Sequence, residues 1–221
     1  MSIQPKPCPT AIRPGTVHGV RDVSSQLAHD LRTPLAAIAM NLDFATSELG
    51  PDLPETLRDA LADCREANQR AVSLVADVAD ALRLASGVLR PRIAAVDVSA
   101  RVGAAVRRMA LEVARRSVRM MWAPDVAIVQ ADGDLLERVL DKLLEQALRH
   151  AHAGDSIDVS LRGDAVVVRV SFGHAGTAPS VEVARQSLAM HFADVAMRAQ
   201  GGAVWTEAEA GALLLVIALP A

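Results

Sequence analysis

Residues 27–35 of the chain are Leu-Ala-His-Asp-Leu-Arg-Thr-Pro-Leu, and this stretch decides how the N-terminal part folds. Its leucines continue an apolar pattern with steps of three and four residues, which places them on one face of a helix. The positions of this stripe are Val23, Leu27, Leu31, Leu35, Ile38 and Leu42. At about 100° per residue, His29 lies about 200° from Leu27 and therefore points away from the stripe. Thr33, four residues later, lies beside His29 on the outward face.

The side chains around His29 are unusual for a surface helix. Asp30 and Arg32 add a carboxylate and a guanidinium to the hydroxyl of Thr33. Pro34 lacks a backbone N–H and crowds the carbonyl of Asp30, so we expect the helix to bend one turn after His29. Packing alone does not require such a group of side chains, and the pattern therefore indicates chemistry at His29.

The composition excludes several classes of protein. A length of 221 residues suits one large domain or two small ones, and a hydrophobic share of 51% is enough to form a core. Aromatic residues make up 2% and the net charge is −3, so we expect no nucleic-acid partner. Two cysteines, Cys8 and Cys64, suit neither a disulfide framework nor a zinc site. No apolar run approaches the ~20 residues that span a bilayer, and no signal-peptide core is present. We therefore expect a cytoplasmic protein with no membrane contact.

The first half of the chain predicts a helical hairpin. Residues 1–20 are rich in proline and glycine and are expected to form a flexible tail. Helices are expected over residues 20–49 and 54–86, with Gly50-Pro51 and Gly87 as stops. Two antiparallel helices with one apolar stripe each bury both stripes poorly on their own. We therefore expect two copies to pair as a homodimer with a four-helix bundle.

The second half of the chain predicts a mixed domain. After a predicted linker at residues 88–98, helical and alternating patterns take turns. Helices are expected over residues 99–116, from 134 onward and over 180–200, and strands near 118–122, 127–129, 157–161, 166–170, 203–207 and 212–219. Asp134-Leu-Leu-Glu137 resembles a capping box at a helix start. These elements predict an α/β sandwich with helices on one face of a mixed sheet, and an α+β class for the whole chain.

The motif His29-Asp30-Leu31-Arg32-Thr33-Pro34 matches the phosphoacceptor box of the sensor histidine kinases residue for residue. The chain resembles the catalytic core of that family, with only the tail left out. The resemblance divides it into a tail (1–20), a dimerisation and histidine-phosphotransfer hairpin (21–88), and a degenerate domain that resembles the family's ATP-binding domain (89–221).

The resemblance also exposes departures in the nucleotide-binding motifs. Two family asparagines, one of which helps to hold Mg²⁺, align with Lys142 and Gln146. An aspartate that binds the adenine amino group aligns with Ser171, and the glycines after it survive at Gly173 and Gly176 with poor spacing. A lysine ammonium offsets phosphate charge but does not ligate Mg²⁺.

The last nucleotide-binding motif is lost as well. Its two glycines align with Ser187 and Ala189, and only ten residues separate Gly176 from Ser187, where the family places a much longer ATP lid. Phosphate binding needs close backbone N–H groups, which glycine usually allows. We therefore expect that ATP binding is lost and that no cofactor is bound, with Mg²⁺ supplied by the partner.

The resemblance assigns roles to the outward face of the first helix. His29 is the expected phosphoacceptor, through a neutral imidazole nitrogen. Asp30 would accept a hydrogen bond from the other ring N–H, although neighbours on a helix do not face each other directly. Arg32 would stabilise phosphoryl oxygens or hold Asp30. Thr33 resembles a residue that positions water to dephosphorylate a partner.

The other histidines have more ordinary interpretations. His150 and His152 lie near a helix end, where a positive charge suits the helix dipole, and a metal site from this pair is not expected. His174 and His191 are expected to be structural or surface residues.

Three functions fit these observations. The leading hypothesis is a dimeric histidine phosphotransferase of a two-component phosphorelay, which passes phosphoryl groups between receiver-domain aspartates of response regulators and His29. The first alternative is an active ATP-dependent sensor histidine kinase with a divergent nucleotide pocket. The second is a non-catalytic regulator that binds a signalling partner, in which His29 would be dispensable.

Overall fold

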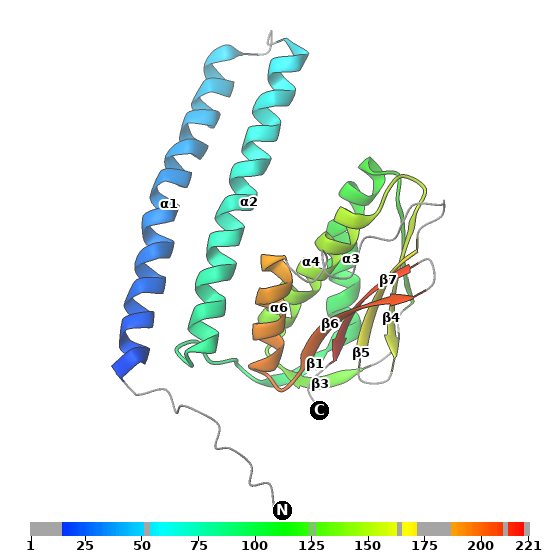
Figure 1. Ribbon diagram of the computed structural model, residues 1–221. Helices are drawn as coiled ribbons and strands as arrows, with labels where there is room; N and C mark the ends of the chain where they lie inside the picture. The colour runs from blue at the N-terminus through cyan, green and yellow to red at the C-terminus, as the bar shows by residue number, and fades with distance from the viewer. Residues whose placement is uncertain are drawn as a thin grey trace, which may run out of the picture.

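A computed structural model describes residues 15–50, 54–123, 125, 127–162, 165–171, 187–209 and 212–218. A long helical hairpin is followed by an α/β domain that lies beside the C-terminal half of its second helix (Figure 1). Helix α1 (Gly15–Leu49) and helix α2 (Glu55–Ala85) pack against each other along the hairpin. Gly50 ends α1 with a φ of 66°, a backbone conformation that residues with a side chain rarely adopt.

Helix α1 starts earlier than the sequence predicted. It begins at Gly15 and not near Val20, so the last residues of the predicted tail are helical. Pro14 is the last residue that opposes a helix there, and Gly19 inside the helix costs only about 1 kcal/mol. The helix continues through Pro34 without interruption, and a bend at Pro34 stays a prediction.

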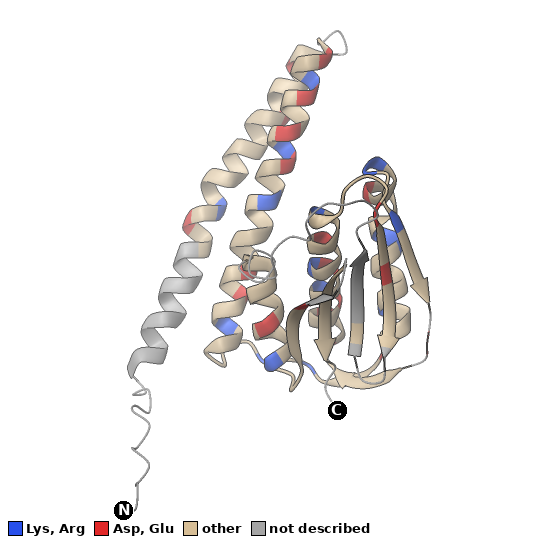
Figure 2. Ribbon diagram, turned by 45° about the vertical axis from the view of Figure 1, so that its right-hand side comes forward, with Lys and Arg blue, Asp and Glu red and all other residues tan. Residues whose placement is uncertain are grey.

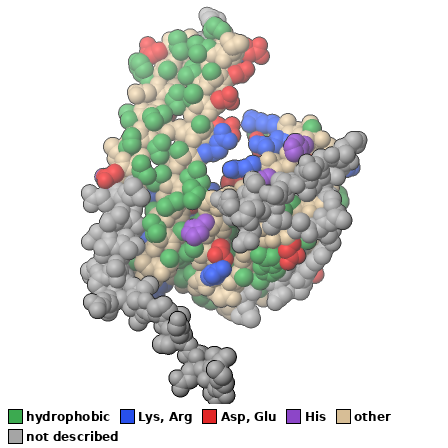
Figure 3. Space-filling view, in the orientation of Figure 1, with side chains coloured by type: hydrophobic (Ala, Val, Ile, Leu, Met, Phe, Trp, Pro, Cys, Tyr) green, Lys and Arg blue, Asp and Glu red, His purple; other side chains and the backbone are tan. Residues whose placement is uncertain are grey.

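The hairpin leaves an apolar face uncovered. Leu31 is 41% exposed and Ile38 is 47% exposed, although both belong to the predicted stripe. Other large apolar side chains exposed on the hairpin are Met40, Phe44, Leu49, Leu57, Val72, Leu74 and Leu82. Figure 3 shows hydrophobic side chains gathered along both helices. An apolar surface of this extent indicates an interaction site. None of the described helices has the length and apolar character needed to cross a bilayer.

A five-stranded mixed sheet forms one layer of the α/β domain. In spatial order its strands are β2 (Arg119–Ala123), β4 (Ser156–Arg162), β5 (Ala165–Ser171), β7 (Ala212–Ala218) and β6 (Ala203–Glu209). β2 and β4 are parallel, and all other neighbours are antiparallel. Helices α3 (Val98–Arg115), α4 (Gly133–His150) and α6 (Leu188–Arg198) cover one face of this sheet (Figure 1). The predicted α/β sandwich after a helical hairpin is thus confirmed.

Two predicted segments differ from the structure. The predicted linker at 88–98 contains strand β1 (Ala94–Asp97), which pairs antiparallel with β3 (Ile128–Ala131) in a small second sheet. The predicted helix over 180–200 begins only at Leu188, because Ser187 has an extended backbone and caps the helix, while residues 180–186 lie outside the described part.

The core of the α/β domain forms on one face of α4. Leu136, Leu140, Leu143 and Leu144 are each at most 1% exposed and belong to one buried cluster with Phe192 of α6. Full burial of each such side chain contributes about 1.5–3 kcal/mol. The core therefore fixes the rotation of α4 and leaves its charged residues on the opposite face.

Asp132 caps α4 and joins three segments. Its Oδ1 accepts hydrogen bonds from the N–H groups of Asp134 and Leu135, at 3.0 and 3.1 Å. Its Oδ2 accepts from the N–H of Arg92 at 2.7 Å, and its own N–H donates to Gln200 Oε1 at 2.6 Å. The N-cap is thus Asp132, and the predicted capping box at residues 134–137 is wrong, because Glu137 forms ion pairs with α3 instead.

We predict that Asp132→Ala lowers the free energy of unfolding by about 1–2 kcal/mol, because it removes the cap of α4 and the acceptor for Arg92. Asp132→Asn keeps the oxygen that caps α4 but loses the acceptor for Arg92, so it is expected to cost about half as much as Asp132→Ala. Urea denaturation followed by circular dichroism measures both values. Equal losses for the two variants would contradict the capping role.

Candidate functional site

His29 lies on the exposed side of α1, as the helical register predicted. Asp30, Arg32 and Thr33 are exposed as well, whereas the adjacent Ala28 is only 5% exposed. Thr33 Oγ1 donates a hydrogen bond of 3.2 Å to the backbone carbonyl of His29. This bond uses the hydroxyl proton and leaves the oxygen able to accept a hydrogen bond from water.

The structure does not bring Asp30 or Arg32 into contact with the imidazole. Within the described part of the chain, neither side chain hydrogen-bonds to His29, and no ion pair joins the two. Asp30 is one position from His29 and two from Arg32, and such side chains on a helix point in different directions, whereas Arg32, three positions from His29, lies near it without bonding to it. In this state His29 presents its ring nitrogens without a bonded partner among the described residues.

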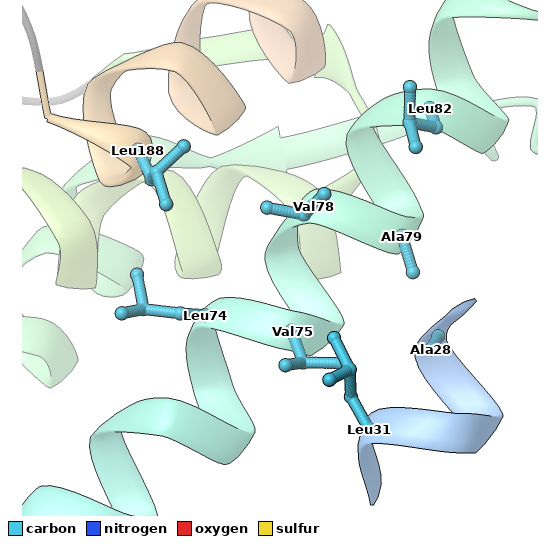
Figure 4. A pocket seen from close by; sticks show the side chains of 8 residues that line it. All are labelled: Ala28, Leu31, Leu74, Val75, Val78, Ala79, Leu82 and Leu188. Atoms are coloured by element: carbon cyan, nitrogen blue, oxygen red, sulfur yellow. The ribbon is translucent and has the colours of Figure 1, made fainter. Parts of the chain in front are cut away.

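A narrow apolar groove lies next to the histidine motif. Its volume is about 140 Å³, and Ala28 and Leu31 of α1 form one side of it. Leu188 of α6 lies on the far side, with α2 between them (Figure 4). The α2 residues in the groove are Leu74, Val75, Val78, Ala79 and Leu82. The groove thus joins the histidine motif to the α/β domain.

Lys142, at one of the two aligned asparagine positions, contacts the hairpin. Its Nζ lies 3.0 Å from Asp77 Oδ2 and 2.9 Å from Ser73 Oγ, both on α2. Glu145 adds a weaker pair at 3.5 Å. The Lys142 side chain is 12% exposed and that of Asp77 is 3% exposed. A protonated ammonium has no lone pair for a cation, so this position carries no metal ligand.

Gln146, at the other aligned asparagine position, is buried and held within α4. Its Nε2 lies 3.0 Å from His150 Nε2, which acts as acceptor if the ring is neutral. Burial lowers the pKa of His150, and the positive charges of Arg149 and His152 lower it further. Gln146 Oε1 is buried without a hydrogen-bond partner among the described residues.

The remaining aligned positions do not form a phosphate cradle in the described part. Ser187 caps α6 by accepting a hydrogen bond from the N–H of Met190 at 3.1 Å, and Ala189 is buried. Ser171 ends β5, and its side chain is not described. Gly173 lies outside the described residues.

Sequence reasoning missed a charged cluster between α2 and α4. Asp77 and Asp80 of α2 pair with Arg138 of α4 at 3.0 and 2.8 Å. Asp77 and Asp80 are three residues apart and share one face of α2. Arg138 and Lys142 are four residues apart and share one face of α4. The spacing shows that each helix has a charged face, but it does not show that the two faces contact each other.

The other histidines and the cysteine carry no site in the described part. His152 and His191 are exposed, and His174 lies outside the described residues. Cys64 is exposed and is a free thiol. Among the residues searched, no group of three His, Cys, Asp or Glu side chains is placed to hold a metal ion.

Comparison with known proteins identifies the hairpin. Residues 20–87 match the family profile of the His Kinase A (phospho-acceptor) domain. The chain is 34% identical over 139 residues to Sensor protein KdpD of Mycobacterium tuberculosis, covering 59% of this chain and 16% of KdpD. It is 29% identical over 193 residues to the Alginate biosynthesis sensor protein KinB of Pseudomonas aeruginosa, covering 76% of this chain and 31% of KinB. The chain thus spans less than a third of these relatives.

Solved structures share the fold. The Acinetobacter baumannii histidine kinase AdeS aligns with a TM-score of 0.60 at 18% identity, over 88% of this chain and 98% of the AdeS chain. Full-length ShkA in complex with AMPPNP aligns with a TM-score of 0.64 at 21% identity, over 89% of this chain and 45% of ShkA.

We predict that the protein loses stability as the pH falls below about 6.5, the ordinary pKa of histidine. The folded pKa of His150 is lowered, so the unfolded chain binds the proton more readily, and acid favours unfolding by up to about 1.4 kcal/mol per pH unit. His150→Phe should reduce this loss between pH 7 and 5, as measured by urea denaturation. His152→Gln, at an exposed neighbour, is the control and should leave most of the loss in place.

Proposed function

Because this chain has the architecture of the sensor histidine kinase catalytic core and belongs with that family, we propose that it is a dimeric histidine phosphotransferase. It accepts the phosphoryl group from an aspartyl phosphate of a response-regulator receiver domain and passes it to another. The observation that carries the proposal is an exposed His29 within the complete motif, combined with Lys142 drawn away to α2.

The transfer needs little from this chain beyond His29. A neutral ring nitrogen forms the N–P bond while the P–O bond to the receiver aspartate breaks, and the freed carboxylate stays on the receiver. Magnesium bound by the receiver offsets the phosphoryl charge. Arg32, three residues from His29, adds a positive charge near the phosphoryl oxygens. The Thr33 oxygen accepts a hydrogen bond from a water that dephosphorylates the partner.

Loss of ATP binding is supported by the described nucleotide-pocket positions. Lys142 is neutralised by Asp77 and cannot ligate Mg²⁺, and Ser187 uses its hydroxyl to cap α6. A side chain at positions 187 and 189 also limits the close backbone approach that phosphates need.

Dimerisation is supported by the uncovered apolar face of the hairpin. Leu31, Ile38 and Phe44 are 41%, 47% and 64% exposed. A second copy would bury these side chains in a four-helix bundle and leave the outward His29 accessible.

The two alternative functions are an ATP-dependent kinase and a non-catalytic regulator. The relatives KdpD and KinB are named sensor proteins, and AdeS is named a histidine kinase, which favours an ATP-dependent kinase with a divergent pocket. A non-catalytic regulator would need no chemistry at His29.

Incubation with receiver domains phosphorylated by ³²P-labelled acetyl phosphate should transfer label to this chain, and His29→Gln should abolish the label. His191→Gln, at another exposed histidine, is the matched control and should retain it. Absence of label from a broad panel of receivers would overturn the proposal. Calorimetry should detect no ATP binding up to about 1 mM. ATP-dependent labelling of His29 would establish the kinase.

The doubly charged variant Ile38→Asp/Phe44→Asp should convert the protein from dimer to monomer, because burying two carboxylates in the bundle is prohibitive. Analytical ultracentrifugation measures the mass. Met121→Asp, at an apolar residue of β2 that is 65% exposed, is the control and should stay dimeric. A wild-type monomer at tens of micromolar would contradict the bundle.

A further inference from the structure

A buried carboxylate lies where α2 meets the α/β domain. Asp77 is 3% exposed in its side chain, and its oxygens lie 3.0 Å from Arg138 Nη2 and 3.0 Å from Lys142 Nζ. Asp80, one turn further along α2, holds the other nitrogen of Arg138 at 2.8 Å. These four residues are called the interdomain clamp. Figure 2 shows acidic and basic residues along α2.

One side of the clamp contacts an aromatic ring, and the other side opens onto a pocket that Ser73, Asp141 and Glu145 also line. The Arg138 guanidinium lies 4.5 Å from the ring centre of Phe192 on α6, within range of a cation–π interaction. One turn before Phe192 on α6, Leu188 shares a groove with Leu74 and Val78 of α2. Apolar neighbours lower the local dielectric and strengthen the attraction between the buried charges.

Buried charges of this kind fix a geometry more than they add stability. Arg138 and Lys142 lie one turn apart on α4, so a slide of α4 along α2 by one helical turn would leave Asp77 with one counter-charge in place of two. Separation of the two domains would also expose more of Leu188 and Leu74, which are 52% and 37% exposed in the docked arrangement. Only one docked position pairs Asp77, Arg138 and Lys142 together.

We infer that the interdomain clamp holds the α/β domain against the hairpin in one position while His29 is phosphorylated. Lys142, at one of the two aligned asparagine positions, works here as an anchor for α2. The clamp is a positioning device, and the surface that it fixes beside His29, from Val78 of α2 to Leu188 of α6, forms part of the receiver-binding site. This last step rests on the proposed function, whereas the docking does not.

Double electron–electron resonance, which measures the distance between two spin labels, tests whether the α/β domain is held in one position against the hairpin. Labels are placed at Ala62→Cys on α2 and Met121→Cys on β2, with both native cysteines replaced by serine. Labelled chains are mixed with an excess of unlabelled chains so that most dimers carry one labelled pair. The intact clamp should give one narrow distance peak. Asp77→Ala should broaden or shift the peak.

A control variant and a second clamp variant accompany Asp77→Ala. Arg108→Ala breaks ion pairs to Glu137 and Asp141 that join α3 to α4 inside the α/β domain, and it should leave the peak unchanged. If Asp77→Ala does not fold, Lys142→Met keeps the Asp77–Arg138 pair and should broaden the peak less. A broad peak with the intact clamp, or an unchanged peak in both clamp variants, would overturn the inference.

Phosphotransfer gives the second measurement. Asp77→Ala should slow transfer from a receiver by about tenfold or more, since misplaced docking surfaces act on that step. Labelling of His29 by phosphoramidate, a small donor that needs no docking surface, should be unchanged. Equal rates from the receiver would refute the positioning role. A narrow distance peak without any receiver transfer would instead refute the proposed function and leave the docking intact.

Discussion

The carboxylate of Asp77 is the point on which the arrangement of the two domains depends. It is buried between an arginine and a lysine of α4, and its burial costs least while both cations stay in place. The rotation of α4 is set independently by its leucines in the core of the α/β domain. Together these two constraints favour the arrangement in which both cations of α4 reach Asp77.

The same arrangement separates two kinds of surface on α1. The apolar stripe keeps Leu31 and Ile38 more than 40% exposed and is the surface that we propose for dimerisation. His29 lies on the other side, where its nitrogens contact no described residue. A histidine that exchanges phosphoryl groups with large partners needs this accessibility, whereas a histidine held for packing does not. The exposed imidazole and the anchored α/β domain therefore suit a protein that receives its phosphoryl group from a partner.

The sequence anticipated much of the fold because most elements have strong local patterns. The stripe of α1, the apolar face of α4 and the alternation of β4 and β5 are all visible in short windows. Strand β1 was missed because its four residues pair with β3, far along the chain. The start of α6 was misplaced because Ser187 caps a helix in a stretch with no other signal.

Some features of the candidate site follow from the sequence, and others depend on the tertiary structure. By itself, the sequence determined which residue faces outward, because helical periodicity places His29 opposite the leucines. It also determined that metal-ligand chemistry is absent at position 142, because the residue is lysine. Only the tertiary structure decided what Lys142 contacts. The ammonium pairs with Asp77, a residue of a different domain, and no periodicity within either helix encodes which charged faces meet. That choice depends on burial of the carboxylate at the interface, a property of the packed chain and not of any local segment.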